Sequence, residues 1–472
     1  MKKGMMLLVV LVGALVAAPF GFSFWAESRL NGLLADLNDA GMVNLTVIKM
    51  DRGWFSTESL IEAEVAASLT QKMKKYSETD GSTPKLILKN TIHHGPFPFM
   101  AGQFSLVPVV ATVDTKFVKS IGSDEPLINM DYSMLTHLEL AGKSHVKVDI
   151  PEWSGPVDEG KANLEWKGLQ ADLKLAKGLG AADINMEAPY LKISGEQGGM
   201  LLESLTLNSE STVGIEGLSL GSAKFSIANV MVEDKKKGVD INMSDIGITA
   251  DTTATGDSID SVTRFDIAKF SMSGEQFGPG AFSLAFRNLD AGAIARISNK
   301  YKEVTQQGEV PQEQMSMMIG ATLLSEMSNL LEKGPEIEIA ELSLGSASGK
   351  LMGNARITVD SSRPELLTNP MLIKDAIIGE VDLEVPEELL VALNMAALRQ
   401  EFKSVDIQYT EEQLKTMAKS RVTKTFSPLV AGNIFTQVGN MYKFNASFKN
   451  GIPVVNGSPF QIPMGGGMPS GQ

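Results

Sequence analysis

The stretch Arg-Phe-Asp-Ile-Ala-Lys-Phe-Ser-Met, residues Arg264 to Met272, sets the pattern for most of the chain. Apolar and polar side chains alternate along it, and successive side chains of a β-strand point to opposite faces of a sheet. Similar short runs recur from Phe104 to about Leu289, between clusters of Gly, Asn, Asp and Ser. This pattern is typical of antiparallel strands with one face toward water. The sequence therefore predicts a long, curved, mostly antiparallel sheet.

The N-terminal stretch does not follow this pattern. Lys2 and Lys3 precede an uncharged, mostly apolar run from Met5 to Ala26. A helix that crosses a bilayer needs about 20 apolar residues, and this run is long enough. The alternative is a cleaved signal peptide, but its best small-x-small site, Gly21-Phe22-Ser23, is weak. We expect residues 1–27 to form an uncleaved membrane anchor.

The orientation of the expected anchor follows from its flanking charges. Lys2 and Lys3 stay on the cytoplasmic side by the positive-inside rule, and Glu27 and Arg29 give no opposing bias. The rest of the chain then lies beyond the inner membrane, in the periplasm of a Gram-negative cell. We therefore expect a single-pass protein of the bacterial inner membrane with its body in the periplasm.

The composition excludes several functional classes. The 472 residues carry a net charge of −14, whereas a general nucleic-acid binder needs basic surface to neutralise phosphates. No nucleic-acid partner is expected. The chain has no Cys, which excludes disulfides, thiolate nucleophiles and thiolate metal ligands.

The fold class is predicted to be α+β and β-rich, with helices packed on the sheet in the C-terminal half. We expect a β-rich domain over residues 28–289, an α+β continuation over 290–463 and a disordered tail over 464–472. Helical periodicity and capping signals place helices in the continuation at Ala291–Thr305, Gln312–Glu332, Pro386–Phe402 and from Thr410 onward. Asn450-Gly451 predicts a hairpin turn near the C-terminus, because this pair readily adopts positive φ.

One corner of the chain is a candidate functional site. It follows a predicted strand and consists of His93, His94, Gly95, Pro96, Phe97 and Pro98. Neighbouring residues of a strand point to opposite faces, so the two imidazoles do not form a simple metal clamp. Metal sites need three or four converging ligands, and no His-x-x-x-His spacing exists. We expect one ring to hydrogen-bond a backbone group, and we assign no catalytic, cofactor-binding or metal-ligating residue and no cofactor.

Several blocks of the sequence resemble a known family. They are Arg52–Ser56 after the expected anchor, His93–Pro98 after a strand, Glu336–Val359, Phe448–Gly451 and Val455–Gly457. In this order they resemble the YdgA-like family of bacterial envelope proteins, which are anchored in the inner membrane and have no assigned biochemical function. The resemblance implies a cellular location and an architecture, and it assigns no catalytic residue.

Two functions remain open at this point. The favoured one is a non-enzymatic, membrane-anchored envelope protein whose sheet presents a groove or face to a lipid or other apolar ligand, a partner or a second copy of the chain. A Met-rich apolar stripe within Gln312–Glu332 is consistent with core packing or with a groove lining. The alternative is an envelope hydrolase acting on lipid or cell-wall material, with His93 or His94 as the base beside a carboxylate. A solvent-reaching cleft that contains His, Asp and Ser would favour this alternative.

Overall fold

The computed structural model describes residues 2–39, 43–65, 85–100, 103–104, 108–121, 132–157, 160–236, 238–306, 312–362, 373–403 and 409–460. The side chains of residues 2–17, and of some residues at the ends of elements, lie outside this description. The expected tail at 464–472 lies outside it as well.

A single sheet of 22 strands dominates the part of the chain that the structure describes. Its first strands are β1 (Val43–Arg52), β2 (Ser56–Val65), β3 (Lys85–His94), β6 (Val109–Ile121), β7 (Ser133–Glu139), β8 (Ser144–Ile150), β9 (Trp153–Val157), β10 (Ala162–Trp166), β11 (Leu169–Leu175), β12 (Ala181–Gly195) and β13 (Gly198–Val213). Its remaining strands are β14 (Ser219–Asp234), β15 (Val239–Thr255), β16 (Ser258–Met272), β17 (Glu275–Asp290), β18 (Glu336–Ser346), β19 (Gly349–Val359), β20 (Ile377–Pro386), β21 (Thr436–Val438), β22 (Met441–Lys449), β23 (Ile452–Val455) and β24 (Ser458–Pro459). Two short strands, β4 (Phe99–Met100) and β5 (Gln103–Phe104), pair only with each other.

The sheet is an antiparallel meander. Strands that pair are consecutive in sequence, apart from insertions between β3 and β6, between β8 and β11, and between β20 and β22. The β9–β10 hairpin extends the sheet beside β12, and β21 pairs beside β22. The predicted antiparallel, β-rich architecture is therefore confirmed. The sheet also continues across residue 290, since β17 pairs with β18.

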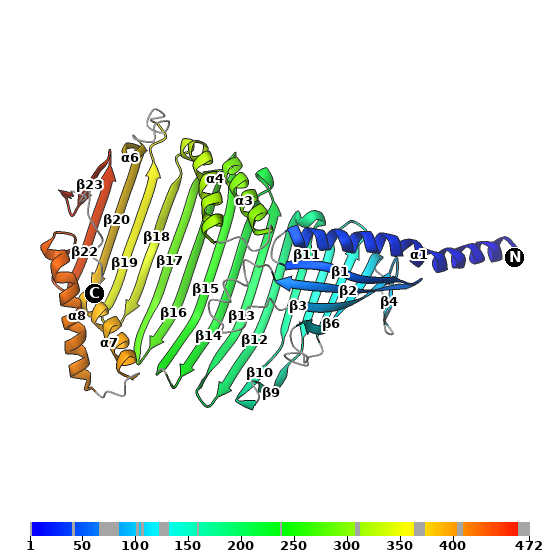
Figure 1. Cartoon of the computed structure of the whole chain (residues 1–472), viewed down its shortest axis with the longest axis horizontal. Helices are drawn as coiled ribbons and strands as arrows, with labels where there is room; N and C mark the ends of the chain where they lie inside the picture. Colours follow the sequence, from blue (N-terminus) through cyan, green and yellow to red (C-terminus); the bar gives the residue numbers. More distant parts are fainter. Residues whose placement is uncertain are drawn as a thin grey trace.

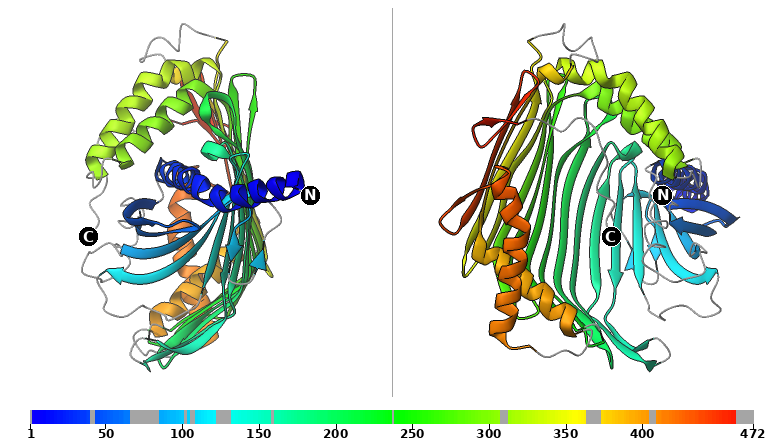
Figure 2. Two further views of the ribbon diagram at one scale, coloured as in Figure 1. Left: turned by 90° about the vertical axis from the view of Figure 1, so that its right-hand side faces the viewer. Right: turned by 60° about the vertical axis from the view of Figure 1, so that its left-hand side comes forward.

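The helices lie on one side of this curved sheet. They are α1 (Lys2–Asp39), α3 (Ala291–Gln306), α4 (Gln312–Glu332), α6 (Ile373–Ala376), α7 (Glu387–Lys403) and α8 (Glu411–Ala431). Figure 1 shows the strands side by side across the molecule, with the first turns of α1 projecting beyond one end. Figure 2 shows the sheet curved like an open trough, with α3, α4, α7 and α8 on its concave side.

A break in the strand ladder runs across the centre of the sheet. Ser204 and Asp245 both have φ of 51°, a left-handed conformation that non-glycine residues rarely adopt. Each lies opposite Ala228 of the strand between them, where the pairing skips one position on both strands. Local irregularities of this kind bend strands. The aligned break is therefore a physical source of the curvature.

Helix α1 packs one apolar core onto the N-terminal strands. Ala26, Leu30 and Leu34 of α1 join Ile92 and Leu138 of the sheet in a buried cluster. The helix is continuous from Lys2 to Asp39 and includes Pro19. Among the residues searched, no helix is both long enough and apolar enough to cross a membrane. Most of the expected anchor lies in residues 2–17, whose side chains are outside the described part, so the anchor stays a prediction.

The predicted C-terminal elements are confirmed with small shifts at their ends. Helix α8 begins with a capping box. The Thr410 hydroxyl accepts from the Gln413 backbone N–H, and Gln413 Oε1 accepts from the Thr410 backbone N–H. In the turn between β22 and β23, Asn450 and Gly451 have φ of 52° and 73°. Positive φ at this pair is the property that predicted the turn.

Candidate functional site

A row of apolar side chains runs across the centre of the sheet. Directly opposite residues of antiparallel strands lie on the same face, so the strand register identifies the members of a row. The row, hereafter the apolar row, consists of Met186, Leu207, Phe225, Ile248, Phe265, Phe282 and Leu342, one from each of β12 to β18. Neighbouring strands lie about 4.8 Å apart, so seven side chains extend over about 29 Å.

The apolar row faces the same side of the sheet as the helices. Its register continues from Leu342 through Gly353 and Leu383 to Phe444. The Phe444 ring lies 5.6 Å from the ring of Phe435, which follows α8. Because the helices lie on the concave side (Figure 2), the apolar row lines the concave face.

The residues that the structure describes leave the middle of this face uncovered. Ile248, Phe265, Phe282 and Leu342 are each 36–37% exposed, although they are large and apolar. Ile337 and Ile357, which pair with each other on β18 and β19, are also exposed. We call these six residues and the rest of the apolar row the apolar trough. An exposed contiguous apolar surface of this kind marks a binding site more often than a solvated surface.

The opposite face of the same strands is polar. The row one residue away contains Asn208, Lys224, Thr249, Arg264, Ser283 and Glu341. Arg264 Nη1 donates to Glu341 Oε2 at 2.8 Å, and its Nε donates to Asp266. These hydrogen bonds to carboxylates raise the pKa of Arg264. The sheet therefore has an ion-paired convex face and an apolar concave face.

Helices close the two ends of the trough. At the N-terminal end, Ile92 and Leu138 are fully buried beneath α1. At the C-terminal end, Leu398 of α7 and Leu414 of α8 form a second core with Tyr442 of β22, whose ring lies 4.5 Å from that of Phe426. Within the part of the chain that the structure describes, the apolar face is thus covered at both ends and open between them.

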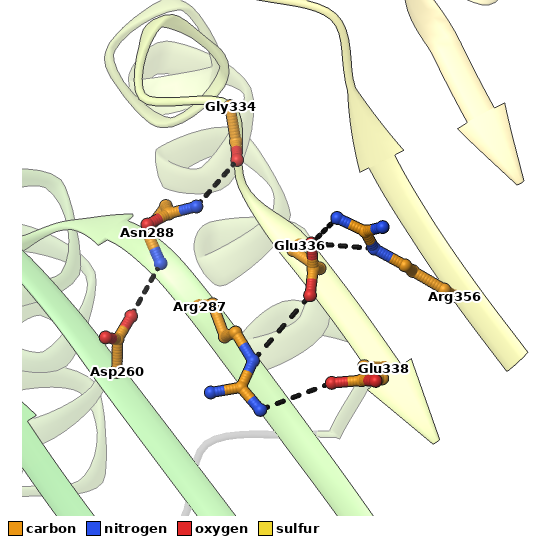
Figure 3. Close-up of polar contacts among 7 residues, drawn as sticks. All are labelled: Asp260, Arg287, Asn288, Gly334, Glu336, Glu338 and Arg356. Carbon is orange, nitrogen blue, oxygen red and sulfur yellow. Dashed lines mark hydrogen bonds and ion pairs between the residues drawn. The ribbon is translucent and has the colours of Figure 1, made fainter. Parts of the chain in front are cut away.

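Polar contacts join the strands at the rim of the sheet where the α3–α4 hairpin ends (Figure 3). The Asn288 backbone N–H donates to Asp260 Oδ1 at 2.8 Å, and the Asn288 side-chain Nδ2 donates to the Gly334 carbonyl oxygen at 3.4 Å. Below this point, Glu336 lies between Arg287 and Arg356, and Arg287 also pairs with Glu338 at 3.3 Å. The expected Met-rich stripe of α4 is mostly half-buried, and only Leu331 of it is buried.

The predicted corner separates its two histidines. His94 is buried, with Nε2 2.9 Å from Thr57 Oγ1 and Nδ1 3.2 Å from the Trp54 carbonyl. This is the backbone contact that we expected for one ring. Burial lowers the pKa of His94. Gly95 is required because an added Cβ would lie 1.9 Å from the Val109 carbonyl oxygen. The remaining corner residues Pro96, Phe97 and Pro98 turn the chain after β3.

His93 belongs to a row on the other face. The strand register aligns His93, Thr112, His137, His145 and Lys174 in successive strands. Thr112 Oγ1 lies 3.1 Å from His137 Nδ1, and His145 Nε2 lies 2.8 Å from Asp172 Oδ2. The sequence alone did not predict that these histidines lie close together, because their proximity depends on the register between neighbouring strands. Within the described ranges, no three His, Asp or Glu side chains converge as metal ligands.

A solvent-reaching pocket of about 770 Å³ lies beside this row, at the ends of β8 and β11 to β15. Its lining includes His145, Asp183, Ser211 and Ser222. The hydrolase alternative required such a cleft around His93 or His94. The pocket contains neither, and His94 is held in buried hydrogen bonds.

Comparison with known proteins identifies a family to which the chain is similar. A family model described as a bacterial protein of unknown function (DUF945) matches residues 1–463. The chain is 23% identical over 418 residues to Protein YdgA of Escherichia coli (strain K12). This alignment covers 81% of the present chain and 78% of Protein YdgA. The resemblance to YdgA-like proteins is therefore confirmed. No solved structure matches the chain.

Proposed function

The chain belongs to the DUF945 family of bacterial proteins of unknown function, and from its own structure we propose that it is a non-enzymatic envelope protein that binds lipid acyl chains along the apolar trough. The observation that carries this proposal is the exposed apolar row between two covered ends. Its length of about 29 Å is close to the roughly 30 Å hydrocarbon thickness of a bilayer, which two acyl chains span end to end. Extended acyl chains therefore suit it in both length and polarity.

The expected affinity is modest. Fully burying a large apolar side chain contributes about 1.5–3 kcal/mol, and about a third of each of four such side chains is available in the trough. Covering them contributes on the order of 2–4 kcal/mol, which by itself corresponds to millimolar binding or weaker. Contacts along the rest of the row add to this. A site of this strength suits reversible uptake and release of lipid better than permanent storage.

Attachment to the inner membrane is part of the proposal. It is supported by Lys2, Lys3 and the uncharged run from Met5 to Ala26. The first turns of α1 project beyond the sheet, where a membrane could surround them (Figure 1). In this arrangement the body lies in the periplasm, and the trough begins within reach of the bilayer surface.

A second candidate, an envelope hydrolase, is favoured by one observation. His145 pairs with Asp172 beside a pocket that Ser211 and Ser222 also line. A carboxylate next to an imidazole orients it and stabilises its protonated form. Release of fatty acid or sugar from envelope material by the wild type, and not by His145→Gln, would support this function.

A matched pair of variants tests lipid binding. Ile248→Asp places a carboxylate in the trough, whereas Thr249→Asp places the same group one residue away on the polar face. We expect the full chain in detergent to bind a phospholipid with a pyrene-labelled acyl chain. Ile248→Asp should weaken this binding about tenfold, and Thr249→Asp should leave it within about twofold.

Equal binding by the two variants would contradict an acyl-chain site in the trough. Mass measurement of the same samples addresses the alternative occupant, a second copy of the chain. If Ile248→Asp converts a lipid-free dimer to a monomer, the trough is an interface between copies and the lipid proposal is wrong.

A further inference from the structure

Exposed aromatic side chains gather where α1 leaves the sheet. Nine aromatic side chains are exposed among the residues that the structure describes, and six of them belong to this region. We call them the aromatic collar: Phe20, Phe24 and Trp25 of α1, Trp54 and Phe55 of the β1–β2 turn, and Phe97 of the corner after β3. Two others, Phe265 and Phe282, line the trough. The collar is thus the main concentration of exposed rings outside the proposed lipid site.

The collar is an organised surface. The Phe20 ring stacks on Trp54 at 4.9 Å and meets Phe24 edge-on at 5.5 Å. The Arg52 guanidinium lies 4.0 Å above the Phe24 ring and also pairs with Glu27. This pairing neutralises both charges beside the rings. The collar therefore presents fixed aromatic groups with little net charge.

The buried histidine of the corner holds the collar in place. The His94 amide donates to the Phe55 carbonyl at 2.9 Å, and its ring contacts the Trp54 carbonyl. Gly95 lies against Phe22 of α1, since a Cβ there would be 2.9 Å from that ring. The Arg52–Ser56 turn and the His93–Pro98 corner thus join α1 at one place. His94 is a positioning residue for Trp54 and Phe55.

The chemistry of the collar fits a membrane interface. Trp and other aromatic side chains concentrate at the level of lipid headgroups, where the rings reach the edge of the hydrocarbon. Phe20 and Trp25 are five residues apart on a helix, which corresponds to about 7.5 Å along its axis. Helices that lie in the interface are buried roughly 5–10 Å, a similar depth. The sequence immediately before the collar, from Met5 to Ala18, is uncharged and apolar.

We propose that the aromatic collar rests in the headgroup region of a lipid bilayer, so that the β1–β2 turn and the corner after β3 contact the membrane together with the end of the α1 anchor. The inference rests on the membrane attachment in the proposed function. It assigns a role to two of the family blocks that the trough does not use, Arg52–Ser56 and His93–Pro98. With α1 and the collar both engaged, the N-terminal end of the sheet is held at the bilayer surface.

Tryptophan fluorescence tests this placement, because the chain has only four Trp. Full-length protein is reconstituted in phosphatidylcholine vesicles with bromine atoms near the headgroup end of the acyl chains. One variant keeps Trp54 alone, through Trp25→Phe, Trp153→Phe and Trp166→Phe. The matched control keeps only Trp153, on strand β9. We expect the bromolipid to lower Trp54 emission about twofold and Trp153 emission hardly at all.

A single substitution serves as a control in case the variants with three substitutions misfold. Trp54→Phe in the otherwise natural chain should lose a large part of the quenching that the natural chain shows. Flotation of the vesicles separates the two proposals. Protein that floats with equal, weak quenching of Trp54 and Trp153 overturns the collar and leaves the attachment standing, whereas protein that does not float overturns both.

Discussion

The concave face of the sheet carries apolar side chains both at its N-terminal end and in its middle, but these two regions differ in what covers them. Beneath α1, Leu138 and Ile92 have no exposed surface, whereas Leu342 and Phe265 in the trough are more than one-third exposed. The strand pattern is the same in both regions, and so is the polar face behind them. The difference teaches that alternation builds the sheet, while the placement of helices decides which apolar surface becomes core and which remains available for binding.

The largest expected effect separates these two regions by stability. Leu138→Ala removes a fully buried side chain and should lower the free energy of unfolding by about 2–5 kcal/mol. Leu342→Ala removes the same group from the trough and should cost about 1 kcal/mol, since part of it already contacts water. Urea unfolding followed by circular dichroism measures both. Equal losses would mean that the trough is as well covered as the α1 core.

A smaller effect distinguishes the regions by acid sensitivity. All four His lie in the first third of the chain. Burial lowers the pKa of His93, His94 and His137 from the usual value near 6.5. The unfolded chain therefore takes up these protons at a higher pH than the folded chain. Stability should be at its full value above about pH 6.5 and should fall as the pH drops through the lowered folded-state values.

Hydrogen exchange at pH 7.5 and pH 5 locates this loss. We expect faster exchange in β3 and β7 at the lower pH and little change in β15 to β19. His137→Gln should reduce the difference between the two conditions. Uniform acceleration over the whole sheet would show that other groups control the response to acid.

The sequence was sufficient to predict the elements and insufficient to predict the site. The alternation in Arg264–Met272 predicted a strand with one polar face, and Thr410 with Gln413 predicted the cap of α8, because both signals are local. Exposure of Phe265 depends on where α7, α8 and the α3–α4 hairpin dock, which no local pattern encodes. Likewise, the approach of His137 to His145 depends on a register between strands, and register is fixed by contacts across the whole sheet.

The most direct test of lipid binding in the trough uses adjacent residues on opposite faces. Phe225 lies in the apolar row, and Lys224 of the same strand points to the polar face. A photoreactive benzoylphenylalanine is placed at either position in the full chain reconstituted with phospholipid vesicles, and the adducts are identified by mass spectrometry. Phospholipid adducts at position 225 and not at position 224 are predicted. Lipid adducts at neither position, or equally at both, would contradict an acyl-chain site on the concave face.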